Sequence, residues 1–238
     1  MSTIAIEKTV GQLVAEQPAR SRVFEKAGID YCCGGKKPLG QACAEKGIEV
    51  DSLVREIEAL DAVTPAAEAD WTTESLTALC DHVQHTHHDY LREALPRLSF
   101  LTEKVSNAHG DRDFRLAEVA VVFAAFREEL ESHMMKEEMI LFPLIRRMES
   151  EGTTAHSHCG SVRNPIRVMV SEHDDAGEAL AKMRALTDDY TPPATACNTY
   201  RAMLDALATL EEDMHVHVHK ENSILFPRAE ELERTVQG

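Results

Sequence analysis

Two copies of one pattern constrain this chain more than any other feature of its sequence. The first copy runs from His133 to Pro143, and the second runs from His217 to Pro227. In each copy a histidine stands four residues before a glutamate, and Leu-Phe-Pro follows at the same distance. Because residues four apart lie on one face of an α-helix, the two side chains can reach one point. An imidazole and a carboxylate that meet at one point are typical metal ligands.

Apolar residues at helical spacing place both His–Glu pairs in a predicted core. Steps of three and four lead back from Glu137 to His133, Leu130, Phe126, Phe123 and Val119, and forward to Ile140 and Leu144. The second pair lies in the series Met203, Leu207, Leu210, Met214, His217, Glu221, Ile224. Burying a carboxylate without a partner is costly. The pattern therefore predicts a bound cation, and it disfavours the alternative of two surface His–Glu contacts.

The fold class that we predict is all-α, with an up-down bundle of four long helices. Only 5% of the residues are aromatic, which favours helices over sheets. We expect bundle helices over about 73–103, 114–150 and 165–187, and a fourth that follows Thr191 with Pro192 and Pro193 in its first turn. The expected domains are a small helical domain over 1–60, a linker over 61–71 and the bundle over 72–238.

The charge and the apolar pattern exclude several classes of partner. A formal net charge of −16 argues against binding to nucleic acid and to anionic membrane surfaces. No stretch approaches 18 uninterrupted apolar residues, and the N-terminus does not resemble a signal peptide. The six cysteines are too scattered for a disulfide scaffold. We therefore expect a cytoplasmic protein that contacts neither nucleic acid nor membrane.

Six side chains are the predicted metal ligands. Each His–Glu pair is preceded by a helix that carries a further histidine on its apolar face, so a two-helix unit is used twice. The predicted set is His88, His133, Glu137, His173, His217 and Glu221. Two glutamates shared by four histidines suit two bridged metal ions, completed by an oxo or hydroxo group. Such donors suit iron or manganese, and donor type alone does not exclude zinc.

Neighbouring histidines on the first bundle helix leave the ligand choice open. Leu91, Leu95 and Leu98 continue an apolar series from His88, but His85 lies partly on the same face and competes with it. We interpret His82 and His87 as surface residues or as neighbours of the ligands.

Three further polar residues near the His–Glu pairs are not counted as ligands. His215 and His219 point away from His217 on an ideal helix, so we expect them to form an exposed pair. Glu138 falls outside the apolar series and is expected to be solvated.

Adjacent cysteines form the second chemical candidate. Cys32 and Cys33 precede Gly-Gly and the lysines at 36 and 37, a setting that would lower the thiol pKa and expose both groups. One interpretation is redox chemistry or iron transfer at Cys32 and Cys33. The other is a helix end with one buried cysteine.

The remaining cysteines receive structural interpretations. Cys43, Cys80 and Cys197 are expected to pack within helices. The segment from His156 to Cys159 contains ligand-type residues and is interpreted as a solvated loop.

Taken in order along the chain, these motifs resemble the iron–sulfur cluster repair di-iron proteins, the Repair of Iron Centres family. The resemblance covers essentially the whole chain and rests on segments 30–36, 92–96, 133–143, 171–174 and 221–228. Members of this family carry a short N-terminal domain with adjacent cysteines, followed by a hemerythrin-like bundle. The resemblance implies two iron ions, ligands at the six positions above, His88 rather than His85, and bridging glutamates.

The chain departs from the oxygen-carrying hemerythrins on its third bundle helix. Those proteins place a second histidine one turn after the first, where this chain has Gly177. One ligand fewer leaves the irons more open, which suits release of iron or small-ligand chemistry better than oxygen storage. The extra histidines at 85, 87, 215 and 219 receive no function from the resemblance.

The resemblance implies repair of iron–sulfur clusters damaged by oxidative or nitrosative stress, with this protein supplying iron. Damaged iron–sulfur proteins, an electron donor and a second copy of the chain are the partners that it implies. No residue is assigned a catalytic role. Two alternatives stay open: reduction of nitric oxide at the two irons, which would make the protein an enzyme, and sensing of oxygen, nitric oxide or iron.

Overall fold

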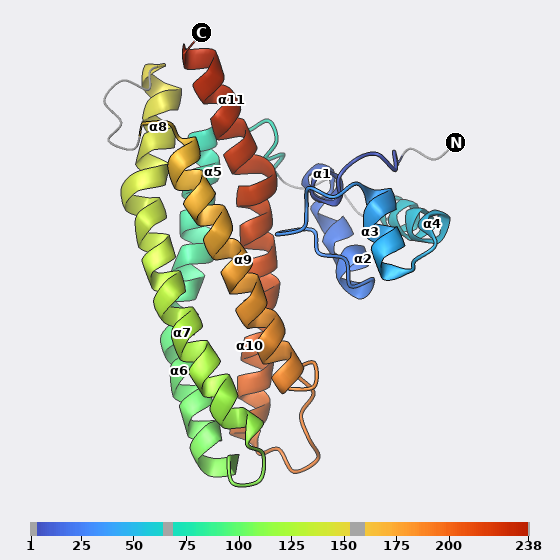
Figure 1. The fold of residues 1–238 in the computed structure, drawn as a ribbon, viewed down its shortest axis with the longest axis vertical. Helices are drawn as coiled ribbons and strands as arrows, with labels where there is room; N and C mark the ends of the chain where they lie inside the picture. The colour runs from blue at the N-terminus through green and yellow to red at the C-terminus, as the bar shows by residue number, and fades with distance from the viewer. Residues whose placement is uncertain (1–3, 64–68, 153–159, 238) are drawn as a thin grey trace.

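The computed structural model describes residues 4–63, 69–152 and 160–237, which form helices and no strand. The predicted all-α class is confirmed. Four long helical rods run side by side, and four short helices lie next to them (Figure 1). Within the described ranges no helix is both long and apolar enough to cross a membrane.

The first two rods are each interrupted by a π-helical turn. Rod 1 consists of α5 (Leu76–Val83), the π turn η2 (Gln84–His88) and α6 (Asp89–His109). Rod 2 consists of α7 (Arg115–Lys136), the π turn η3 (Glu137–Leu141) and α8 (Phe142–Glu151).

The third rod is the single helix α9 (Arg163–Leu186), without a π turn. Rod 4 consists of α10 (Asn198–Lys220), the π turn η4 (Glu221–Leu225) and α11 (Phe226–Gln237). The second and fourth rods therefore have the same construction, and each of their π turns begins at a glutamate of the repeated pattern.

The apolar series that we predicted is buried, with one correction. Val119, Phe123, Phe126 and Leu130 on α7 are at most 4% exposed, and Met203, Leu207, Leu210 and Met214 of the predicted series on α10 are at most 1% exposed. Ile140 was predicted to be in the core but is 44% exposed, whereas Leu141 is 1% exposed. The reason is η3, because a π turn holds one more residue than an α turn and shifts the following residues.

The fourth rod starts later than predicted. Pro192 and Pro193 do not occupy its first turn, since α10 begins at Asn198. They lie instead in a loop that starts with three residues in the left-handed conformation, at φ of 50° to 59°. The side chain of Tyr190, the third of these residues, is buried and anchors the start of the loop.

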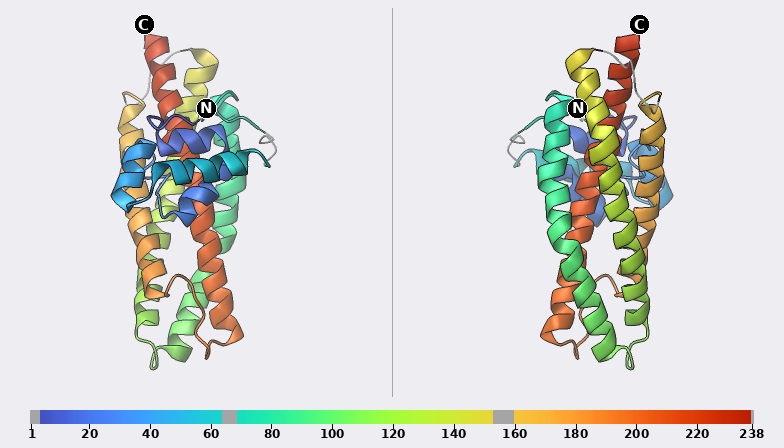
Figure 2. Two further views of the ribbon diagram at one scale, coloured as in Figure 1. Left: turned by 90° about the vertical axis from the view of Figure 1, so that its right-hand side faces the viewer. Right: turned by 90° about the vertical axis from the view of Figure 1, so that its left-hand side faces the viewer.

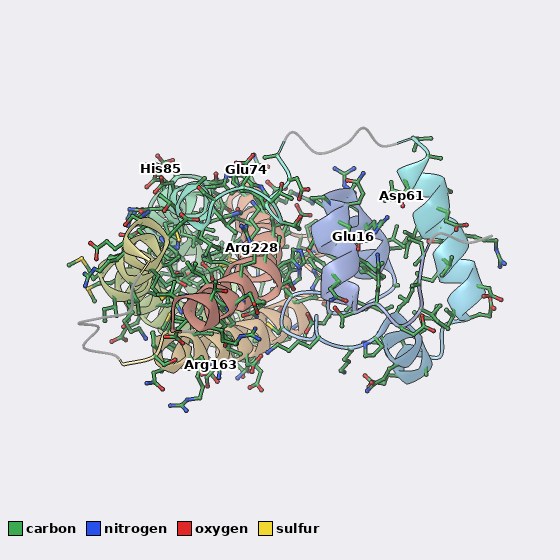
Figure 3. All side chains as sticks on the ribbon, turned by 90° about the horizontal axis from the view of Figure 1, so that it is seen from above. Glu16, Asp61, Glu74, His85, Arg163 and Arg228 are labelled. Atoms are coloured by element: carbon green, nitrogen blue, oxygen red, sulfur yellow. The ribbon has the colours of Figure 1, made fainter. Side chains whose placement is uncertain are left out.

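The four short helices cover one side of the bundle at α10 (Figure 2). They are α1 (Val10–Glu16), α2 (Ser21–Lys26), α3 (Leu39–Lys46) and α4 (Val50–Asp61), with a 3₁₀ turn at Pro18–Arg20. Helix α1 contacts both α10 and η4. Seen along the rods, the short helices lie beside the bundle, with Glu16 nearer to it than Asp61 (Figure 3).

Glycine allows α1 to come close to η4. The backbone N–H of Gly11 donates to the carbonyl of Gly35 at 2.9 Å. A Cβ atom at position 11 would lie only 2.4 Å from Ser223 Oγ. Larger residues at position 11 would therefore push the short helices, with their adjacent cysteines, away from the glutamate-bearing turn.

Candidate metal centre

Four histidines and two glutamates from the four rods meet inside the bundle. All six side chains are at most 3% exposed. Their ligand atoms form two groups within 4.8 Å, namely His88, Glu137, His217, Glu221 and His133, Glu137, His173, Glu221. The six predicted ligands are thus brought together, and each glutamate belongs to both groups.

Each of the two glutamates faces one histidine from each of the two groups. Glu137 Oε2 lies 3.3 Å from His88 Nε2 and 3.4 Å from His133 Nε2. Glu221 Oε1 lies 3.2 Å from His217 Nε2, and its Oε2 lies 3.0 Å from His173 Nε2. Each glutamate therefore lies between a histidine of one group and a histidine of the other.

Several polar atoms at this centre lack hydrogen-bond partners. Both carboxylate oxygens of Glu137, Oε2 of Glu221 and Nε2 of His88 are buried and unpaired within the part of the chain that the structure describes. Leaving such groups dry and unpaired is costly, whereas oxygen and nitrogen donors around a cation are satisfied. The donor set therefore fits metal binding.

Three of the histidines are oriented by a hydrogen bond at Nδ1. His88 Nδ1 lies 2.8 Å from Glu138, His133 Nδ1 lies 2.9 Å from Glu172, and His173 Nδ1 lies 3.0 Å from Asn222. These contacts leave Nε2 of each ring directed at the glutamates. The sequence analysis missed all three acceptors.

Glu138 requires a correction, because it is not a solvated surface group. Its side chain is 18% exposed and contacts both His88 and Arg92. The repeat contained a signal for it: Glu138 and Asn222 each directly follow the glutamate of their copy. Both positions serve the histidine of the preceding rod.

The aromatic residue of each Leu-Phe-Pro covers the same histidines. Phe142 stacks on His88, with ring centroids 5.8 Å apart, and Phe226 stacks on His173 at the same distance. The repeated motif thus supplies a glutamate, an orienting polar group and an apolar cover.

Charges at the centre are strongly coupled. Burial disfavours the charged form of His133, but the carboxylate of Glu137 outweighs it and raises the pKa of His133 to about 10. Burial and Glu221 act to raise the pKa of Glu137, yet His133 and His88 bring it below its ordinary value. The hydrogen bond from His133, with Lys136 beside it, lowers the pKa of Glu172 to about 2.

His87 lies next to the metal centre and not at the surface. It is 2% exposed, and its ring stacks on His217 at 5.1 Å, with 2° between the planes. Its Nδ1 contacts Asp213 at 2.8 Å. Burial of His87 and His88 together follows from the π turn η2, which widens the helix where both rings point inward.

Lys220 completes this neighbourhood. Its ammonium group lies 2.7 Å from His82 Nε2 and 2.9 Å from His87 Nε2. Burial lowers the pKa of Lys220 to about 8, so the protonated form predominates at pH 7.

The remaining histidines fall into two kinds. His85 is exposed on the outer rim of the bundle, where its Nδ1 binds the carbonyl of Asp81 at 2.8 Å (Figure 3). His219 was predicted to be exposed but is 4% exposed, because Tyr31 and α1 cover this face of α10. The predicted exposed pair of His215 and His219 is therefore wrong, and only His215 is partly accessible.

Cys32 differs from the prediction of an accessible thiol with a lowered pKa, and the alternative interpretation of one buried cysteine describes it better. Cys32 is buried, and its contact with Cys33 together with burial raises the pKa of its thiol far above the ordinary value. The predicted lysine effect fails because Lys37 pairs with Glu45 at 2.6 Å. Asp30 accepts the backbone N–H groups of Cys32, Cys33 and Gly34, and this carboxylate beside Cys32 further disfavours a thiolate.

Cys33 reaches the metal centre from the short helices. Its Sγ lies 3.5 Å from the carbonyl oxygen of His173. A Cβ atom at Gly177 would lie 3.4 Å from the same sulfur, so the thiol occupies the place where a side chain at position 177 would project. Asn222, which orients His173, also donates to the carbonyl of Cys32 at 3.4 Å.

Among the other described cysteines, the interpretation of Cys197 was wrong. Cys43 and Cys80 are buried as expected, but Cys197 is exposed at the start of α10. The backbone N–H of Tyr200, together with His109, lowers the pKa of its thiol to about 7. His156, His158 and Cys159 lie outside the described residues.

A cavity of about 500 Å³ opens onto one side of the centre. His133, His173 and Glu172 line it, together with the carboxylates of Glu128, Glu129 and Asp175. His88 and His217 do not line it and are 0% exposed. The two groups of ligands therefore differ in access.

Comparison with known proteins identifies both parts of the chain. Residues 79–229 match the model of the hemerythrin HHE cation binding domain, and residues 6–61 match a domain of unknown function, DUF542. The chain is 41% identical to the iron-sulfur cluster repair protein YtfE of Enterobacter sp. (strain 638) and 40% identical to YtfE of Citrobacter koseri and of Escherichia coli O81. Each alignment covers 94% of this chain and 96% of the relative. The chain therefore belongs to the hemerythrin HHE cation binding family, in the group of iron-sulfur cluster repair proteins named YtfE.

Proposed function

We propose that this protein stores two iron ions at the centre and supplies iron for the repair of damaged iron–sulfur clusters. The names of its relatives support repair, and the histidine–glutamate set supports iron as the cargo. His88 and His217 would hold one ion, His133 and His173 the other, and Glu137 and Glu221 would bridge both.

The observation that carries this proposal is the unequal access to the two ligand groups. A storage site needs buried donors to bind iron, and a supply site needs a route by which iron can leave. The cavity at His133 and His173 offers that route, and its three further carboxylates are suitable oxygen ligands for a departing cation.

We propose Cys33 as the first acceptor of iron on the route to a damaged cluster, with Cys32 beside it. The two sulfurs lie 3.9 Å apart, and Asn222 connects their loop to His173. The raised pKa of Cys32 is compatible with this role only if iron itself displaces the thiol proton, as metal binding does at cysteine sites.

Reduction of nitric oxide at the two irons is the second candidate. The cavity of about 500 Å³ is large enough to admit diatomic molecules to His133 and His173. The ring of carboxylates around the cavity favours passage of cations over that of a neutral gas, so iron supply is the function that the geometry supports better.

The other partners follow from the same proposal. Damaged iron–sulfur proteins would receive the iron, an electron donor would keep the stored iron reduced, and a second copy of the chain would form a dimer. We place this work in the cytoplasm, a reducing compartment in which the thiols of Cys32 and Cys33 would stay free.

The test is anaerobic mixing of iron-loaded protein with a dehydratase whose [4Fe–4S] cluster has been damaged by nitric oxide. We expect dehydratase activity to return, and we expect the iron lost by this protein to equal the iron gained by the dehydratase. Steady consumption of nitric oxide without loss of iron would support the reductase instead. The double variant Cys32→Ala/Cys33→Ala should lose repair but keep its iron, and undiminished repair would exclude the transfer role.

A further inference from the structure

His217 is the one predicted histidine ligand whose second ring nitrogen has no hydrogen-bond partner among the described residues. Its Nε2 faces Glu221 at 3.2 Å, whereas its Nδ1 is buried and meets no acceptor in the described ranges. An imidazole that coordinates a metal through Nε2 carries its proton on Nδ1. This nitrogen is therefore a buried donor in search of an acceptor, and leaving it unpaired is costly.

The repeat indicates where an acceptor for His217 should stand. In the first copy His133 Nδ1 contacts Glu172, which stands one residue before the histidine ligand of the third rod. The corresponding position for the second copy is one residue before the ligand of rod 1, and it holds His87. The ring of His87 stacks on that of His217 with 2° between the planes. Parallel stacked rings present their faces to each other and not their nitrogens, so position 87 does not supply the acceptor.

Asp213 offers the missing carboxylate from one turn earlier on the same helix. Its Oδ1 lies 2.8 Å from His87 Nδ1. Its Oδ2 is buried and, like His217 Nδ1, has no partner in the part of the chain that the structure describes. Asp213 precedes His217 by four residues, so both lie on one face of α10, and the Cα–Cβ bond of His217 tilts toward the side of Asp213. A buried acceptor and a buried donor thus stand one turn apart.

We propose that Asp213 positions His217. Its Oδ2 accepts the Nδ1–H of His217, while its Oδ1 accepts the Nδ1–H of His87. One carboxylate then fixes two stacked imidazoles, and it takes the part that Glu172 plays for His133. The inference rests on the metal site of the proposed function and is independent of cluster repair.

The test measures how tightly each iron is held. We would load the full-length protein with iron(II) without oxygen and compete with a chelator at equilibrium. Asp213→Leu keeps the approximate size of the side chain but removes both acceptor oxygens, so the iron held by His217 should bind about 10–100-fold more weakly. The other iron should keep its affinity. Asp205→Leu, at an exposed position two turns earlier on α10, should bind both irons as the unchanged protein does.

A second background separates a direct effect on His217 from an effect through His87. His87→Phe keeps an aromatic ring against His217 but removes the donor that occupies Oδ1. In this background Asp213→Asn should keep the iron affinity within a few-fold, because its one oxygen serves His217 alone. Asp213→Leu should still lose about 10–100-fold. Equal affinities of these two variants, which have similar shapes, would overturn the proposal.

Nuclear magnetic resonance gives a readout that needs no variant at Asp213. Zinc binds the same donor types and is not paramagnetic, so the protein would be loaded with zinc and labelled with ¹⁵N-histidine. The Nδ1–H proton of His217 should resonate close to those of His88 and His133, whose acceptors are carboxylates. A His217 resonance well upfield of both would contradict the proposal. Protein that binds no metal at all would instead refute the proposed function, so the two failures are distinguishable.

Discussion

The two halves of the metal centre share their glutamates but differ in their surroundings. The closed half consists of His88 and His217, which have no access to solvent. The open half consists of His133 and His173, which line the cavity of about 500 Å³ and have Cys33 above them. The ligand types are identical, so the difference in access comes from the residues around them.

Corresponding positions of the repeat show how this difference arises. Lys136 and Lys220 each stand one residue before a glutamate that belongs to both ligand groups. Lys136 pairs with Glu172, which binds His133 and lies at the cavity. Lys220 instead contacts His87, whose ring covers His217. In the open half the lysine therefore pairs with the carboxylate of Glu172, which leaves His133 at the cavity. In the closed half the lysine contacts the imidazole of His87, which covers His217.

Loss of a shared glutamate should remove iron from both halves of the centre, so that no difference between them remains. Glu137→Ala or Glu221→Ala removes a ligand from both halves, and we expect loss of both irons and of cluster repair. Iron analysis on anaerobically purified protein measures this, with Glu131→Ala on the exposed face of α7 as the control. Retention of two irons by either variant would show that the glutamates do not bridge.

Loss of one histidine should separate the halves. In the unchanged protein we expect a chelator to remove iron in two phases, the fast phase from the open half. His173→Ala should keep only a slowly removed iron, and His88→Ala only a rapidly removed one. Stopped-flow absorbance with an iron chelator measures both phases, and identical kinetics for the two variants would mean that access does not set release.

Loss of an orienting group should act on one half only and more weakly. Glu172→Gln should lower iron affinity of the open half by about 10–100-fold, the usual cost of removing such a partner. Glu138→Gln should do the same in the closed half, because it orients His88. Chelator competition at equilibrium measures the two affinities, and an equal loss from both halves in each variant would contradict the assignment.

The last expected effect is on the stability of the metal-free protein. The pKa of His133 is raised to about 10 in the folded state, against about 6.5 in the unfolded chain. Its charged form therefore stabilises the fold fully below pH 6.5, and this contribution is lost as the pH rises through about 10. The free energy of unfolding, measured by denaturant unfolding from pH 6.5 to 10, should decline over this range. The decline should be smaller in His133→Gln.

Much of the centre was predictable because buried glutamates at helical spacing have few explanations other than a metal. Four rods and five ligand positions follow from that pattern, and the choice of His88 over His85 came from the family resemblance. The orienting residues were missed because a hydrogen bond between rods leaves no trace in the spacing of a single helix, as with Glu172 and His133. Burial of His219 was missed for the same reason, since its cover comes from Tyr31, far away in sequence.

The loop that contains Cys32 and Cys33 shows a different limit of prediction from sequence. Composition around Cys32 and Cys33 predicted reactive thiols, yet the structure turns the lysines outward and places the Asp30 carboxylate beside Cys32. The local sequence shows which residues are charged, but not which way their side chains point. The start of the fourth rod was also missed, since α10 begins at Asn198 and not at the prolines.

The π turn at Glu137–Leu141 also determines how the rod would respond to the smallest change of length that a gene can undergo in frame. Because a π turn holds one residue more than an α turn, deleting the codon for Met139 would restore an ordinary α-helix and leave Phe142 on the side of the rod that faces His88. A codon lost from the regular part of α7 would instead rotate the residues on its two sides by about 100° relative to each other. The turn is thus a place where the rod can lose one residue without turning its ligands away from the centre.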